Sequence, residues 1–351
     1  MNGKTINIAG QIIGIDQPCF IIAEAGVNHN GDLELARKLV DAAVSAGANA
    51  VKFQTFVADR LVTTAAPKAE YQKETTETTE SQWEMIHRLE LSKESHQALM
   101  RYCQDKEILF MSSPFDELSA DLLDELGLPV FKIPSGEITN LPYLRHVARK
   151  QKPLIISTGM SYLSEVESAV LAIEEEQNHD YALLQCTSNY PADPADVNLA
   201  AMDTMARAFG VPVGYSDHTR GIEVPLAAVA LGARIVEKHL TTDRTLPGPD
   251  HRASLEPLAF RSMVQSIRLV ESALGDGRKV PAPSEAAIAA VARKSLFAAK
   301  DIPTGSILTD DLVAIMRPGT GLPPTMLKYI VGRAVRNSIP NGTPITLENL
   351  V

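Results

Sequence analysis

Residues 211–239 read VPVGYSDHTRGIEVPLAAVALGARIVEKH and contain two short apolar runs separated by a longer stretch. The runs VPVGYS and RIVEKH favour β-strands, and residues 221–231 between them predict a helix. Two such strands joined by a helix are typical of a parallel βαβ unit. Each run leads into polar residues, among them His218 and His239. We therefore expect a parallel sheet whose strands end in polar side chains.

The same alternation recurs along the chain and gives eight strand-like runs in total. The other six are CFIIAE from Cys19, AVKFQ from Ala50, ILFMSS from Ile108, VFKI from Val130, LIIST from Leu154 and ALLQCT from Ala182. Helices are expected between the runs, at residues 32–46, 92–106, 163–176 and 221–231. Eight units of this kind predict a (β/α)8 TIM barrel, an α/β fold. The alternative is a doubly wound open sheet, but residues 24–31 read EAGVNHNG and lack its usual GxGxxG turn.

Three further segments complete the predicted organisation. Residues 5–14, TINIAGQIIG, suggest a short hairpin that plugs the N-terminal end of the barrel. Residues 58–82 are long and polar, which indicates either a lid or a mobile loop. We expect the barrel domain to span residues 1–275 and a Gly- and Pro-containing linker residues 276–290. Residues 291–351 then form a small domain with several short strands.

Composition limits the classes of partner. The 351 residues are 45% hydrophobic, and no apolar run reaches the length of a membrane span. The N-terminus lacks the pattern of a signal peptide, so we expect a cytoplasmic protein without membrane contact. A formal net charge of −10 argues against nucleic acid binding. It also means that an anionic substrate must be held by local basic groups.

Two lysines stand at positions that should point into the barrel mouth. Lys52 and Lys132 lie within apolar strands, and burying a lysine without an anionic partner is costly. Hydroxyl groups at neighbouring strand ends could donate to phosphate oxygens. Internal salt bridges, for instance with Glu24 or Glu237, are the alternative. Other polar residues at or just after strand ends are Gln54, Ser113, Ser135, Glu137, Ser188 and Ser216.

Two histidines end neighbouring strands. His218 and His239 follow strands seven and eight, so their rings could share one metal ion. Alternatively, each is an ordinary hydrogen-bonded histidine. Four other histidines fall on helices or loops and are expected to be solvated: His87, His96, His146 and His179.

The same strand ends carry a family resemblance. The segments AEAGVNHNG, VKFQT, SSPFD, FKIPSGEI, ISTGM, CTSNYP, GYSDHT, VEKHLT and LPGPDH resemble, in order, those of the N-acetylneuraminate (sialic acid) synthase family. That family includes legionaminate and pseudaminate synthases. The tail, with RPGTGLPP around Arg317, is similar to the family's antifreeze-like (SAF, β-clip) domain.

The resemblance implies an enzyme that condenses phosphoenolpyruvate with an N-acetylated hexosamine by C–O cleavage. It implies a divalent metal, commonly Mn²⁺ with Mg²⁺ or Co²⁺ as alternatives, held by His218 and His239. It also implies a domain-swapped homodimer in which Arg317 caps the neighbour's sugar site. Phosphoenolpyruvate would be bound by Lys52, Ser113, Lys132, Ser135, Ser216 and either Ser188 or Asn189. The sugar and the reacting centre would face Glu24, Gln54, Glu137, Tyr190 and Asp250.

In the reaction so implied, Lys52 and Lys132 neutralise substrate charge and either Glu24 or Glu137 moves protons. The acceptor is N-acetylmannosamine or 2,4-diacetamido-2,4,6-trideoxymannose, and CTSNYPADPADVNL and SDHTRGIEV look more like the legionaminate side. One alternative is a Schiff-base aldolase using Lys132. Another is a phosphoenolpyruvate synthase acting on a phosphorylated sugar. A third, from a different class, is an ice- or glycan-binding protein with the barrel as scaffold.

Overall fold

The computed structural model describes residues 4–69, 72–73, 76 and 80–351. The chain divides into two compact units, Met1–Gly275 and Asp276–Val351. Among the described residues, no helix has both the length and the apolar character needed to cross a bilayer.

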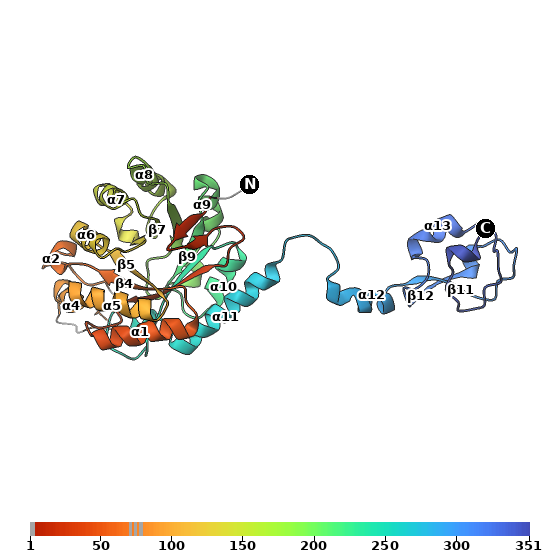
Figure 1. Ribbon diagram of the computed structural model, residues 1–351, viewed down its shortest axis with the longest axis horizontal. Coiled ribbons are helices and arrows are strands. Elements are labelled where there is room, and N and C mark those ends of the chain that lie inside the picture. The colour runs from red at the N-terminus through yellow and green to blue at the C-terminus, as the bar shows by residue number, and fades with distance from the viewer. Residues whose placement is uncertain (1–3, 70–71, 74–75, 77–79) are drawn as a thin grey trace. The chain divides into compact units, whose positions relative to one another are not determined.

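The first unit is a barrel. Its eight parallel strands pair in the order β5-β4-β3-β10-β9-β8-β7-β6, and β5 and β6 at the two ends of this order also lie in contact. The sheet therefore curls into a nearly closed barrel ringed by helices (Figure 1). This confirms the predicted TIM barrel. The strands are β3 (Phe20–Gly26), β4 (Ala50–Thr55), β5 (Leu109–Pro114), β6 (Phe131–Ile133), β7 (Leu154–Ser157), β8 (Tyr181–Cys186), β9 (Val213–Asp217) and β10 (Ile235–His239).

The helices begin where the sequence supplies capping side chains. The Asp32 carboxylate accepts hydrogen bonds from the backbone N–H groups of the first turn of α1, and the Ser92 hydroxyl does the same for α5. The helices of this unit are α1 (Leu33–Ala46), α2 (Ala58–Leu61), α4 (Gln82–Arg88), α5 (Lys93–Asp105), α6 (Glu117–Glu125), α7 (Leu141–Ala148), α8 (Leu163–Glu174), α9 (Ala201–Phe209), α10 (Glu223–Ala230) and α11 (Pro257–Leu274).

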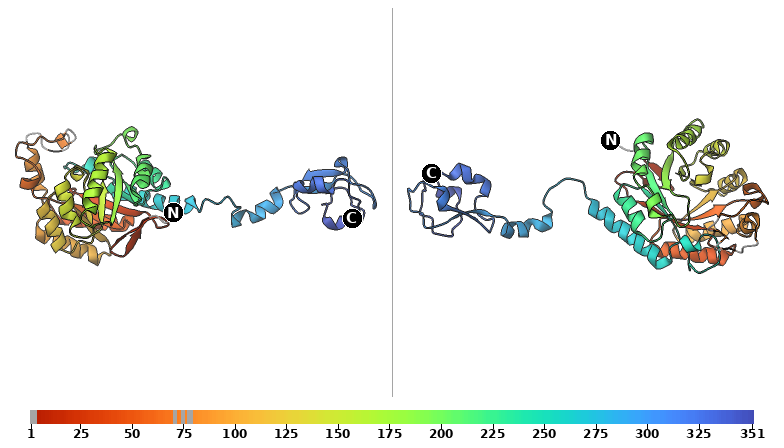
Figure 2. Two further views of the ribbon diagram at one scale, coloured as in Figure 1. Left: turned by 90° about the horizontal axis from the view of Figure 1, so that it is seen from above. Right: turned by 180° about the vertical axis from the view of Figure 1, so that it is seen from behind.

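The predicted N-terminal hairpin is present and seals one end of the barrel (Figures 1 and 2). It consists of β1 (Ile6–Ile8) and β2 (Gln11–Ile13). Its buried isoleucines pack against apolar side chains of the barrel strands, including Phe20, Met111 and Ile235. Because this end is filled with apolar side chains, polar chemistry is left to the opposite end, where the strands terminate.

One sequence-based expectation in this unit is wrong. His96, expected to be solvated, is fully buried on the inner face of α5. Its ring nitrogens lie 2.8 Å from Thr55 Oγ1 and 2.9 Å from the Ser92 carbonyl oxygen. The imidazole therefore joins helix to strand, a role that its helical position alone does not reveal.

Of the predicted loop 58–82, the structure describes α2 and the start of α4, while residues 70–71, 74–75 and 77–79 lie outside the described residues. In the stretch predicted as a linker, η4 (Pro283–Glu285) is followed by α12 (Ala286–Ala292).

The second unit has its own apolar core, which includes Leu296, Ile302, Ile330 and Ile345. Strands β11 (Ser295–Ala298) and β12 (Val313–Met316) pair antiparallel, and isolated bridges such as that between Ile302 and Ile339 extend the pairing. The remaining elements are η5 (Asp310–Leu312), η6 (Pro324–Met326), α13 (Leu327–Ile330) and η7 (Leu347–Asn349).

Candidate active site at the barrel mouth

The carboxyl ends of the barrel strands enclose a cavity of about 440 Å³, here called the mouth cavity. Alternate residues of a strand point to the same side, so Lys52 and Gln54 of β4 both face the cavity. By the same rule Glu237 and His239 of β10 face it, whereas Lys238 between them points outward. Its predicted lining residues are Glu24, Lys52, Gln54, Ser113, Lys132, Ser135, Ser188, Tyr190, Ser216, His218 and His239.

Two lysines and two glutamates form the floor of the mouth cavity. Lys52 Nζ lies 2.8 Å from Glu24 Oε2 and donates to Ser113 Oγ at 3.0 Å. Glu237 lies between the lysines, with one oxygen 3.6 Å from Lys52 Nζ and the other 3.6 Å from Lys132 Nζ. All four charged residues are at most 5% exposed. Lys52 and Lys132 therefore face the cavity and also lie in salt bridges, which the sequence analysis had given as alternatives.

Hydroxyl groups complete this floor. Ser216 donates to Glu237 Oε1 at 3.0 Å, and Lys132 donates to Ser157 Oγ at 2.7 Å. The hydroxyls can rotate to donate instead to an incoming anion. The floor is therefore a set of cations and adaptable donors that surrounds a cavity.

Burial shifts the pKa values of these groups in opposite directions. Burial raises the pKa of Glu24 to about 7 although Lys52 opposes the shift. Burial also acts to raise the pKa of Glu237, but Lys132 and Lys52 outweigh it and hold the pKa at about 2. Burial lowers the pKa of Lys132, and Glu237 offsets this only in part. Near neutral pH, Glu237 is the fixed anion and Glu24 can exchange a proton.

A small cradle lies beside the lysines. The Gly159 backbone N–H donates to Ser135 Oγ at 2.9 Å. A Cβ atom at residue 159 would lie only 2.4 Å from Ser188 Oγ and 2.8 Å from Ser135 Oγ, so a side chain at this position would displace the two hydroxyls. The converging hydroxyls suit the oxygens of a phosphate or carboxylate.

The two histidines lie side by side, with ring centroids 5.5 Å apart. His218 Nδ1 lies 2.7 Å from the Thr187 carbonyl oxygen, which fixes the ring and leaves Nε2 for a ligand. His239 Nδ1 is buried without a hydrogen-bond partner among the residues that the structure describes, and the Asp250 carboxylate lies 4.0 Å from it. Burial, followed by the charge of His218, lowers the pKa of His239 well below its usual value. A neutral, orphaned imidazole beside an oriented one fits a divalent metal ion.

Within the described ranges, no group of three or more His, Cys, Asp or Glu side chains is arranged to hold a metal. A metal bound by His218 and His239 would therefore take its remaining ligands from water or substrate.

Four predicted residues lie away from the lining of the mouth cavity. Glu137, in η1 (Ser135–Glu137), accepts a hydrogen bond from Asn140 at 2.7 Å. Asn189 is exposed and accepts from the Tyr190 N–H at 3.1 Å. Asp250, before η3 (His251–Ala253), lines an adjoining cavity. Arg317 belongs to the second unit, where it follows β12 and is exposed.

Sequence reasoning missed several residues of the site. Glu237 was recognised only as a possible salt-bridge partner, although it contacts both lysines. Gly159 could have been recognised from the segment ISTGM, in which a glycine follows closely after the end of a strand. Gln82, on the polar loop, also lines the cavity and gives no local signal.

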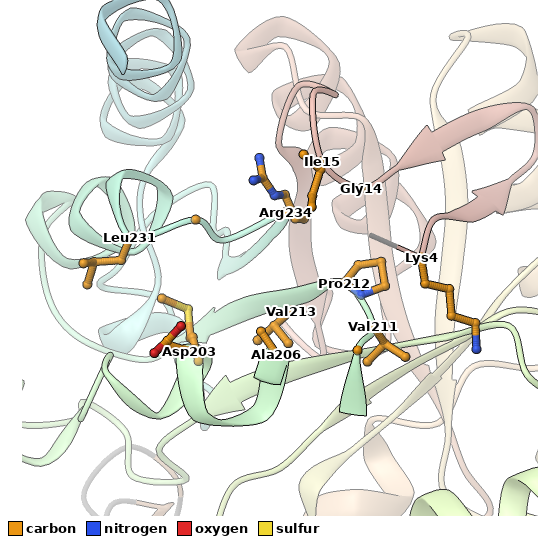
Figure 3. Close-up of a pocket in the computed structure, with 13 residues that line it drawn as sticks. Lys4, Gly14, Ile15, Asp203, Ala206, Val211, Pro212, Val213, Leu231 and Arg234 are labelled. Atoms are coloured by element: carbon orange, nitrogen blue, oxygen red, sulfur yellow. The ribbon is translucent and has the colours of Figure 1, made fainter. Parts of the chain in front are cut away.

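Another cavity, of about 380 Å³, lies at the opposite end of the barrel, where β9 and β10 begin (Figure 3). Lys4, Ile15 and Arg234 surround it beside the hairpin. It contains none of the predicted site residues.

Both units of the chain are similar to known proteins. Residues 39–279 match the model of the NeuB family, and residues 293–351 match that of the SAF domain. The chain is 50% identical to the N,N'-diacetyllegionaminic acid synthase of Legionella pneumophila, covering 96% of each protein. It is 38% identical to human N-acetylneuraminate-9-phosphate synthase, covering 97% of the chain and 95% of the human protein. A crystal structure of the N-acetylneuraminic acid synthetase of Leptospira borgpetersenii superposes with a TM-score of 0.71 at 37% identity, covering 81% of this chain and 94% of that one.

Proposed function

The chain belongs to the NeuB family and is a synthase that condenses phosphoenolpyruvate with an acetamido sugar, and we propose that its acceptor is 2,4-diacetamido-2,4,6-trideoxymannose. The product would be a legionaminate-type nine-carbon sugar acid, with phosphate released by C–O cleavage. The identity of 50% to a legionaminic acid synthase, against 38% to the human neuraminate-type enzyme, supports this acceptor.

The observation that supports the use of phosphoenolpyruvate is the pair of buried lysines around Glu237. Phosphoenolpyruvate brings a carboxylate and a phosphate, and Lys52 and Lys132 supply fixed positive charge for them in a site shielded from water. Ser113, Ser135, Ser188 and Ser216 lie around the same cavity and would donate to the oxygens.

Glu24 is the proposed proton carrier of the reaction. The C3 carbon of phosphoenolpyruvate forms a bond to the sugar aldehyde carbon, water adds at C2, and the C2–O bond to phosphate then breaks. One proton leaves the water as it adds and one reaches the sugar alkoxide, while the proton of the new C2 hydroxyl passes to the departing phosphate as the keto group forms. With a pKa near 7, Glu24 can accept the first and donate the second. Glu137 does not line the mouth cavity, which favours Glu24 as the proton carrier.

We propose that His218 and His239 hold a divalent metal, Mn²⁺. When bound there, the metal would supply Lewis acidity toward the sugar carbonyl. The orphaned Nδ1 of His239 supports this assignment within the described residues. His239→Ala should abolish the rise in melting temperature that Mn²⁺ gives the wild-type protein, because a ligand that binds only the folded state stabilises it. An equal Mn²⁺ effect on both proteins would contradict the assignment.

We also propose a homodimer, acting in the cytoplasm, in which Arg317 of one copy completes the sugar site of the other. Its exposed position and its place in the SAF-matching segment support this. Mixing inactive Lys52→Met protein with Arg317→Ala protein should restore activity through mixed dimers. No recovery after subunit exchange would contradict a shared site.

The direct test of function is phosphate release from phosphoenolpyruvate with Mn²⁺, using each of the two acetamido sugars in turn. We expect release that is faster with the 2,4-diacetamido sugar than with N-acetylmannosamine and that stops with EDTA. Release with neither sugar would refute the function.

A Schiff-base aldolase is the second candidate, because burial lowers the pKa of Lys132 and an uncharged amine is the nucleophile that such enzymes need. Borohydride inactivation in the presence of substrate, together with indifference to EDTA, would favour it.

A further inference from the structure

A second cavity adjoins the mouth cavity and differs from it in chemistry. This side cavity, of about 290 Å³, shares four lining residues with the mouth cavity: Gln54, Gln82, Phe115 and Tyr190. The two cavities therefore adjoin at these four side chains.

The remaining walls of the side cavity are mainly apolar. Val27, Phe56, Met85 and Leu89 line it and form a buried cluster of their own, separate from the barrel core. Phe56 packs edge-on against Phe115, with ring centroids 6.0 Å apart. Among the described residues that line it there is no lysine or arginine, so the side cavity does not suit a phosphate.

One amide group stands at the junction of the two cavities. Gln82 lines both, and its side chain forms no hydrogen bond within the described part of the chain. It occupies the first turn of α4, whose start is fixed by a reciprocal pair of hydrogen bonds between Ser81 and Glu84. A carboxamide in this place can donate one hydrogen bond and accept another.

We propose that the side cavity binds the far end of the acceptor sugar and selects a second acetamido group and a C6 methyl. Gln82 pairs with the acetamido group, whose N–H and C=O match a carboxamide, and the apolar cluster contacts the methyl groups. N-acetylmannosamine carries hydroxyls at both positions, and hydroxyls buried against apolar walls without partners cost free energy. The inference rests on the proposed function and adds the residues that set its acceptor specificity.

The test compares kcat/KM for the two acceptors in the wild type and in Gln82→Leu, which keeps the approximate size and removes the amide. We expect a fall of about tenfold for the 2,4-diacetamido sugar, the effect of one lost hydrogen bond. Activity with N-acetylmannosamine and the KM for phosphoenolpyruvate should change by less than about twofold. Gln104→Leu, on an exposed position of α5, is the matched control.

A second variant guards against misfolding of the first. Leu61→Asn places an amide in the half-buried wall of the side cavity with little change in volume, and should also reduce the preference for the diacetamido sugar. An unchanged acceptor ratio in the folded variants would overturn the inference, as would an equal loss with both sugars. Wild-type protein inactive with both sugars would refute the proposed function itself, a result that needs no variant.

Discussion

Two groups of buried lysines and carboxylates lie on opposite faces of the barrel sheet. The mouth cluster, Lys52, Lys132, Glu24 and Glu237, faces the cavity. The outer pair, Lys238 and Asp217, comes from the intervening positions and points away from the cavity. Both groups are almost fully buried, yet their hydrogen bonding differs.

The outer pair is complete within the protein. Lys238 donates to Asp217 and to the Thr219 carbonyl. Asp217 also accepts from the Tyr215 hydroxyl at 2.9 Å and from the Thr219 N–H and hydroxyl at 2.9 and 2.8 Å. Such a pair ties β9 to β10 and leaves no capacity for a ligand.

The mouth cluster is incomplete. Glu237 stays 3.6 Å from each lysine, and its Oε2 has no hydrogen-bond partner in the described part of the chain. Buried charges that border a cavity without full internal pairing are typical of binding sites. We therefore propose that the mouth cluster serves the substrate, whereas the outer pair serves the fold.

The sharpest way to separate these roles is Lys52→Met. We expect kcat/KM for phosphate release to fall by about 10³-fold, because a fixed cation is lost from a site shielded from water. Lys93→Met, which removes an exposed ion pair with Glu125, is the control and should leave the rate unchanged. Comparable activity of the two variants would refute the assignment of the mouth cluster.

Substitution in the outer pair should lower the stability of the protein. Lys238→Met leaves the buried Asp217 without its cation, and we expect the free energy of unfolding to fall by about 3 kcal/mol or more. Adding Asp217→Asn should recover part of this loss. Denaturant unfolding of both variants measures the effect, and a neutral Lys238→Met would remove the structural role.

Much of the fold, and part of the difference between the mouth cluster and the outer pair, could be predicted from the sequence. The period of apolar runs identifies all eight strands, and alternation within a strand places His218 and His239 together at the mouth. The same alternation does not show which lysine lies next to which carboxylate. The relative positions of Glu237 and Lys132 depend on how all the strands of the barrel pack together. The burial of His96 was missed for the same reason.

Loop residues were less predictable still. Ser188 and Asn189 are adjacent and chemically similar, and only the backbone path after β8 sends the first into the cavity and the second to solvent. Glu137 matched a family segment, yet its carboxylate pairs with Asn140 outside the cavity lining.

The different positions of Ser188 and Asn189 predict a smaller effect on kcat/KM at the edge of the mouth cluster. Ser188→Ala should lower kcat/KM by about tenfold, the usual effect of losing one hydrogen bond to a charged group. Asn189→Ala should change it by less than about twofold. Steady-state kinetics with varied phosphoenolpyruvate decides this, and the reverse order would exclude Ser188 from the anion cradle.

The smallest expected effect is a pH dependence. Protonated Glu24 is neutral and leaves Lys52 free for an anion, whereas ionised Glu24 competes for it. Affinity for phosphoenolpyruvate should therefore be higher below pH 7 and should weaken as the pH rises through about 7. Glu24→Gln, which cannot ionise, should flatten this profile. A profile unchanged in the variant would assign the titration to another group.

If the mouth cluster is an incomplete charge set that receives phosphoenolpyruvate, calorimetric titration of phosphoenolpyruvate should distinguish wild-type from Lys132→Met protein. We expect saturable binding to the wild type and an affinity at least about tenfold weaker in the variant, which loses one charge-assisted contact. Equal affinity in the two proteins would contradict it.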